Sequence, residues 1–165
     1  MTRAGLVRRL AASIYESLIL ATLALVLGFS LLPLLGPSGV PAATDRLAVL
    51  SPGARATLFV ALFVLYAGYS AWLSSGGRRT LPMQTWRLAL RTGQGAPPSV
   101  ARALGRYLAW WIGPACALGA YLALRPLGYG RWALAALAIN YVWALIDADR
   151  QFLHDRMAGT RLVRV

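Results

Sequence analysis

Four long apolar blocks, separated by arginine-rich segments, limit what this chain can fold into. A helix needs about 20 apolar residues to cross a bilayer, and four stretches come near that length, at about 10–35, 56–73, 104–124 and 130–147. Charged residues make up 13% of the 165-residue chain, whereas a soluble domain normally carries about 25%. We therefore predict a single all-α integral membrane domain over residues 1–165, with four transmembrane helices.

The basic residues predict the orientation of these helices. All 17 are arginine, and the net charge is +12. Thirteen lie on one side, in the N-terminal segment, in the loop at 75–103 with the adjoining Arg106, and in the tail at 148–165, and four lie on the other side. Cytoplasmic segments are enriched in arginine and lysine, so both termini and the middle loop are expected in the cytoplasm. The first external loop, which contains Asp45 and Arg46, reads as irregular and solvated.

The middle loop and the tail carry patterns of their own. Thr80 can cap a short interfacial helix over 81–86, with Pro82 in its first turn. The stretches 87–91 and 160–165 show the alternation of short strands. They could pair into a two-stranded ribbon on the cytoplasmic side, which we favour, or remain separate basic segments held near anionic lipid.

Glu16 is the charge that most needs an explanation, because it falls inside the first apolar block. It lies about six residues into the predicted span, roughly 9 Å along the helix axis, which is the cytoplasmic third of the membrane. Carboxylates within the membrane often mark ion paths. The other interpretation, which we favour, is a structural clamp with an arginine, for which Arg9, Arg102 and Arg106 are the candidates.

Two further carboxylates, Asp147 and Asp155, follow the fourth block. Asp147 is expected at the membrane interface, and Asp155 is expected to pair with a cytoplasmic arginine and so order the tail. His154 neighbours Asp155, but no third ligand at a suitable spacing completes a metal site. In the third block, Gly113 and Pro114 predict a kinked helix.

Three motifs together resemble the RDD family of small bacterial membrane proteins. They are "RRLAASIYESLIL", with Arg9 at the family's arginine position, "TLPMQTWRLAL", and "DADRQFLHDRMAGTRLV", with Asp155 at an aspartate position. The chain departs from the family pattern at Glu16, where an aspartate is usual, and at Pro82, where a glycine is usual. The resemblance implies a bacterial inner-membrane location. It leaves the biochemical role undefined, although cation/proton antiport has been proposed for some members.

The resulting hypothesis is a non-enzymatic scaffold or accessory subunit with a cytoplasmic charge network. Its members would be Arg9, Glu16, Arg102, Arg106, Asp147 and Asp155. The alternative is a small oligomeric transporter that uses Glu16 as its ion- or proton-binding group. No phosphate loop, hydrolase elbow or zinc-protease motif is present, so we expect neither an enzyme nor a cofactor. The arginines lie between apolar blocks, which favours anionic phospholipid over nucleic acid as their partner. The sequence leaves a homo-oligomer or another membrane protein open as a further partner.

Overall fold

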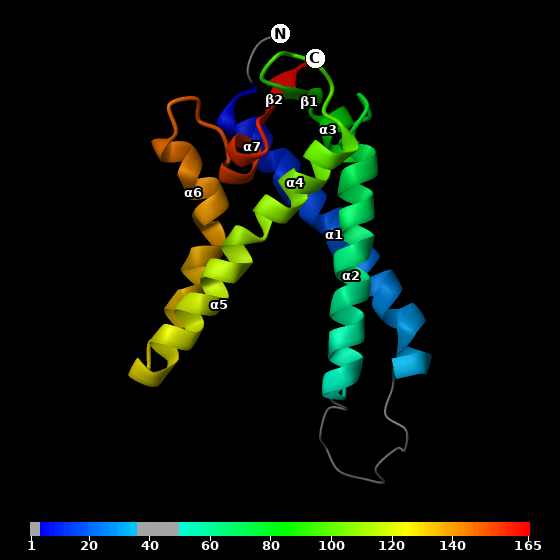
Figure 1. The fold of residues 1–165 in the computed structure, drawn as a ribbon, viewed down its shortest axis with the longest axis vertical. Helices are drawn as coiled ribbons and strands as arrows, with labels where there is room; N and C mark the ends of the chain where they lie inside the picture. Colours follow the sequence, from blue (N-terminus) through cyan, green and yellow to red (C-terminus); the bar gives the residue numbers. More distant parts are fainter. Residues whose placement is uncertain (1–3, 36–49) are drawn as a thin grey trace.

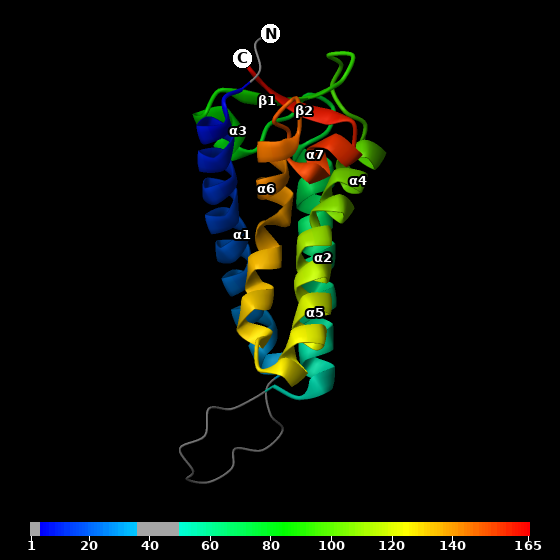
Figure 2. The same cartoon turned by 90° about the vertical axis from the view of Figure 1, so that its left-hand side faces the viewer.

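Two pairs of long helices descend from a common layer and diverge from each other (Figures 1 and 2). The computed structural model describes residues 4–35 and 50–165, so the prediction made for the loop with Asp45 and Arg46 lies outside the described residues. The first pair comprises α1 (Leu6–Leu35) and α2 (Pro52–Leu73). The second comprises α4 (Val100–Trp110), α5 (Ile112–Leu124), the 3-10 helices η1 (Arg125–Leu127) and η2 (Gly130–Ala138), and α6 (Ile139–Ile146).

Three helical stretches in the described residues are long and apolar enough to cross a membrane, namely Leu6–Leu35, Pro52–Leu73 and Val100–Leu127. The fourth predicted span corresponds to the apolar stretch Gly130–Ile146, which is shorter. The first three of these stretches, which begin with α1, α2 and α4, each start about four residues before the predicted start. Ser51 and Ser99 explain two of these starts, because their hydroxyls accept from the backbone N–H of Ala54 and Arg102.

The third predicted span is broken where the sequence predicted a kink. The chain leaves the α-helix at Trp111, between α4 and α5. Pro114 has no N–H to donate to the Trp110 carbonyl four residues earlier, and its ring crowds that carbonyl. The proline therefore interrupts the helical hydrogen bonding about one turn before its own position. In the fourth stretch, residues 130–138 form a 3-10 helix rather than the expected α-helix.

A small layer covers the arginine-rich end of the helices. It contains α3 (Leu81–Thr85), strand β1 (Leu88–Thr92), α7 (Leu153–Met157) and strand β2 (Thr160–Arg164). The strands pair antiparallel, with Leu90 opposite Leu162, which confirms the predicted ribbon. Leucines of both strands join side chains of α1 and α3 in one apolar core, made of Ala4, Ala12, Met83, Leu88, Leu90 and Leu162.

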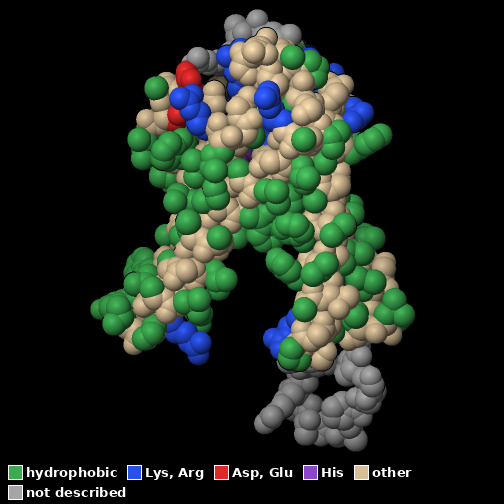
Figure 3. Space-filling view, in the orientation of Figure 1, with side chains coloured by type: hydrophobic (Ala, Val, Ile, Leu, Met, Phe, Trp, Pro, Cys, Tyr) green, Lys and Arg blue, Asp and Glu red, His purple; other side chains and the backbone are tan. Residues whose placement is uncertain are grey.

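Both ends of the described chain meet in this layer. The backbone N–H of Ala4 donates to the carbonyl of Leu162 at 3.4 Å. Arginine and carboxylate side chains gather at this end of the surface, whereas apolar side chains cover much of the diverging helices (Figure 3). The layer therefore brings the start, the middle loop and the tail of the chain to one end of the molecule.

Candidate functional site

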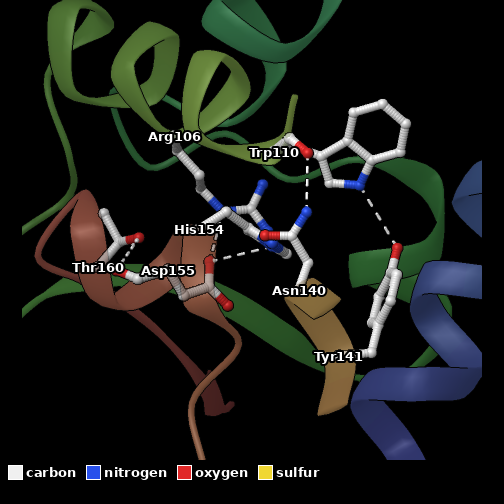
Figure 4. Close-up of polar contacts among 7 residues, drawn as sticks. All are labelled: Arg106, Trp110, Asn140, Tyr141, His154, Asp155 and Thr160. Atoms are coloured by element: carbon white, nitrogen blue, oxygen red, sulfur yellow. Dashed lines mark hydrogen bonds and ion pairs between the residues drawn. The ribbon is translucent and has the colours of Figure 1, made fainter. Parts of the chain in front are cut away.

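A buried ion pair lies where α4 meets α7 (Figure 4). The Nε of Arg106 donates to Oδ1 of Asp155 at 2.5 Å, and the Asp155 side chain is 1% exposed. The Nη2 of Arg106 lies 3.3 Å from Nε2 of His154. The predicted pairing of Asp155 with an arginine is therefore present, and one arginine holds both residues of the His-Asp dipeptide.

Burial and the neighbouring arginines together set the charges of His154 and Asp155. Desolvation lowers the pKa of His154 to about 4, against the raising effect of Asp155. The imidazole is therefore neutral near pH 7, and since arginine can only donate, Nε2 accepts. Burial alone would raise the pKa of Asp155, but Arg106, with a further contribution from Arg9, holds it below its usual value. Asp155 is thus an anion inside a largely apolar layer.

Arg9 enters the same region from α1. Its side chain is buried, its Nη2 donates to the carbonyl of Arg150, and its guanidinium lies 5.0 Å from the centre of the Phe152 ring. Arg150 has a φ of 51°, a left-handed conformation that is uncommon for a residue other than glycine. Arg9 therefore fixes the strained turn between α6 and α7 to the first helix.

Asp147 organises the other side of that turn. Its Oδ2 accepts the backbone N–H of Asp149 at 3.1 Å and of Gln151 at 2.9 Å. Arg156 of α7 lies 3.7 Å from Oδ1 of Asp147 and donates to Asp149 at 3.0 Å. The Asp147 carboxylate thus accepts two backbone N–H groups of the turn that follows α6.

Glu16 lies apart from these charges. Its Oε2 accepts from the hydroxyl of Thr80 at 2.7 Å, and the hydroxyl of Tyr69 is a second hydrogen-bonding neighbour. Within residues 4–35 and 50–165, no arginine forms an ion pair with Glu16. The arginine clamp expected for Glu16 is thus absent there, and a hydroxyl takes its place. Thr80 also accepts from the backbone N–H of Met83, which confirms its predicted role as the cap of α3. Through its bond to Glu16 it also connects α1 to the start of α3.

Arg102 does not join the network either. It is exposed and lies along a groove on the outer face of α4. Arg106 is four residues further along the same helix, one turn deeper, and can therefore reach Asp155. In the part of the chain that the structure describes, the predicted set divides into a connected group around Arg9, Arg106, Asp147 and Asp155, a separate Glu16, and an outlying Arg102.

A neutral clamp joins the third and fourth helical stretches beside the charges (Figure 4). Nδ2 of Asn140 donates to the Trp110 carbonyl at 2.7 Å, the carbonyl that loses its usual donor because of Pro114. A Cβ on Gly113 would lie 3.1 Å from that Nδ2, so the glycine makes room for the amide. The sequence analysis singled out Gly113 and Pro114 and did not connect them with Asn140. The missing carbonyl donor before Pro114 was the signal that could have paired it with Asn140.

Phe152 is a further contributor to the connected group that sequence reasoning did not assign to it. Phe152 is fully buried between Arg9 and the ring of Tyr141, whose centroid lies 5.1 Å away. The described residues contain no group of three histidine, cysteine or carboxylate side chains able to hold a metal ion. The arrangement is suited to holding five chain segments together by charge and hydrogen bonding, namely α1, the start of α3, α4, the turn after α6, and α7.

Comparison with known proteins places this arrangement in a family. The family model for the RDD family matches residues 3–159, a range that includes α1, α3, β1, α7 and the Arg106–Asp155 pair and ends just before β2. A search of curated proteins and a search of solved structures gave no match. Because the match covers nearly the whole chain, and the apolar helices agree with it, this protein is a member of the RDD family of membrane proteins.

Proposed function

We propose that the chain is a four-span protein of the bacterial inner membrane with both termini in the cytoplasm. The arginine bias supports this orientation, as does the meeting of both chain ends in one layer. The fourth stretch is short in residues, but nine of them are in a 3-10 helix. With a rise of about 2.0 Å per 3-10 residue and about 1.5 Å per α residue, Gly130–Ile146 is roughly 30 Å long, the thickness of a bilayer core.

We further propose a structural role, as a non-enzymatic scaffold or accessory subunit. The observation that carries this role is the Arg106–Asp155 pair. The Asp155 carboxylate of α7 is 1% exposed to solvent and is paired with an arginine of α4. A transported ion would need a carboxylate that it can reach and leave, and Asp155 is enclosed. The partner of such a scaffold would be another membrane protein or a second copy of the chain.

The transport alternative rests on Glu16, which is half-buried and accepts from Thr80. The hydroxyls of Thr80 and Tyr69 hold Glu16 at one end of the α1–α2 pair, and among the described residues no further carboxylate lies along α1 or α2 as a second ion ligand. The scaffold role is therefore the better explanation of Glu16 as well, with its carboxylate joining α1 to the start of α3.

Reconstituted protein distinguishes the two roles. Purified protein in liposomes loaded with a pH-sensitive dye is exposed to gradients of Na⁺, K⁺ or Li⁺. The scaffold role predicts no cation-dependent pH change beyond that of empty liposomes. A pH change that depends on the cation and disappears in Glu16→Gln, but persists in the matched variant Thr80→Ser, would overturn it in favour of transport.

A further inference from the structure

A groove of about 730 Å³ runs along the outer face of α4 beside α7. Its volume is within the usual range for small-molecule sites, about 300–1,000 Å³. The residues that line it recur at helical spacing from Ser99 to Ile112, so it extends about 20 Å along the helix. Met157 and Ala158 form its other wall.

The two ends of this groove differ in chemistry. Ser99 and Arg102 lie at the end nearest the capping layer, and Leu108 and Ile112 lie at the other end, within the stretch long and apolar enough to cross a membrane. None of the described residues that line the groove is a carboxylate. A complementary occupant is therefore anionic at one end and apolar along the rest of its length.

Arg102 is available to such an occupant, unlike its neighbours. Arg106 pairs with Asp155, and Arg156 pairs with Asp147 and Asp149. In the described ranges, 4–35 and 50–165, the Arg102 side chain makes no ion pair. Its charge at the membrane boundary is unbalanced, and a phosphate group is a strong acceptor for an arginine.

We propose that this groove binds an anionic phospholipid. The headgroup phosphate lies against Arg102, and an acyl chain lies over Gly105, Leu108 and Ile112. The lipid is favoured over a soluble anion because the groove continues for several turns as an apolar surface on a membrane helix. The proposal goes beyond the scaffold role and does not depend on it, since it requires only that α4 enters the membrane.

Gly105 provides a direct test, because it lies in the groove and a Cβ there would have no neighbour within 4 Å. Gly105→Leu places an apolar side chain in the groove, and its Cβ meets no neighbour. Gly119→Leu is the matched control, since Gly119 is an exposed helix glycine away from the groove whose added Cβ would also meet nothing. For the charge, Arg102→Gln is compared with Arg79→Gln, which removes another exposed arginine from the same end of the molecule.

The measurement is native mass spectrometry of the purified protein with equimolar phosphatidylglycerol and phosphatidylcholine. Wild type and both controls are expected to retain phosphatidylglycerol about tenfold better than phosphatidylcholine. Arg102→Gln should lose the preference, and Gly105→Leu should lose retention of both lipids. Equal loss in Arg102→Gln and Arg79→Gln would overturn the proposal in favour of a diffuse basic surface.

A second measurement uses the wild-type protein and so avoids any folding defect of the variants. Phosphatidylglycerol with a photoreactive acyl chain should label peptides that contain residues 105–112 or 157–158. Labelling elsewhere only would overturn the site. If soluble glycerol phosphate displaces the labelled lipid as effectively as unlabelled lipid does, the groove is a soluble-anion site instead. If a cross-linked dimer forms and excludes the lipid, the occupant is a second copy of the chain.

Discussion

The clamp between Asn140 and the Trp110 carbonyl makes a sharp energetic prediction, because its cause is in the sequence. Pro114 removes the donor that this carbonyl would have had, and the Asn140 amide supplies another at 2.7 Å. Asn140→Leu keeps the shape of the side chain and removes the donor. We expect it to lower the free energy of unfolding by about 1–2 kcal/mol, since a buried carbonyl is left unpaired, near the upper end of values for hydrogen bonds between membrane helices.

The same substitution should cost less when residue 114 can donate. In a Pro114→Ala background the N–H of residue 114 can reach the Trp110 carbonyl, so Asn140→Leu should cost about 0.5 kcal/mol or less. The coupling of about 1 kcal/mol exceeds the error of about 0.3–0.5 kcal/mol usual for independent sites.

The assay is reversible unfolding of the detergent-solubilised protein in sodium dodecyl sulfate, followed by circular dichroism, for all four members of the cycle. Tyr141→Phe is the control, because Tyr141 is next in sequence and lies 3.5 Å from the Trp110 indole nitrogen rather than on its carbonyl. The effect of Tyr141→Phe on the free energy of unfolding should simply add to that of Pro114→Ala. An equal cost of Asn140→Leu in both backgrounds would refute the idea that Asn140 replaces the missing proline donor.

Two other predictions concern the capping layer. The pKa of His154 is about 4 in the folded protein, against an ordinary histidine value of 6.5, so as the pH falls the unfolded chain takes up a proton before the folded one does. The free energy of unfolding should therefore fall by about 3 kcal/mol as the pH drops from 6.5 to 4. His154→Gln should flatten that part of the stability curve measured by chemical unfolding, and an unchanged slope would contradict the assignment. Thr80→Ala should destabilise the protein by about 1–2 kcal/mol, because α3 loses its cap and Glu16 loses its donor, whereas Thr80→Ser should change it little. Equal losses for the two substitutions would show that the hydroxyl is not responsible.

Features that depend on neighbouring residues were predictable from the sequence. Thr80 and Pro82 predicted α3, and the alternation around Leu88 and Leu162 predicted both strands of the ribbon. The apolar blocks predicted the long helices to within about four residues at their starts. Each of these follows from local backbone preference or from the period of the apolar residues, so no knowledge of the packing was needed.

Contacts between distant segments were predictable only in part. Asp155 was expected to meet an arginine, but the choice of Arg106 over Arg102 depends on how α4 crosses α7. The partner of Glu16 was expected to be an arginine because charge suggested it, whereas the packing of α1 against α3 brings a hydroxyl there instead. The break at Trp111 was predictable from Pro114, whereas the 3-10 form of residues 130–138 was not predicted from the sequence.

The central claim is that buried Asp155 fastens the tail to the helices, and hydrogen exchange measures this most directly. Removing one partner of a buried ion pair costs about 3–5 kcal/mol, so in Asp155→Ala the amides of Thr160–Arg164 and Leu88–Thr92 should exchange about a hundredfold faster or more than in wild type. Asp149→Asn alters a more exposed carboxylate, 32% accessible, and should change exchange by less than about tenfold. Unchanged protection of both strands in Asp155→Ala would contradict the claim.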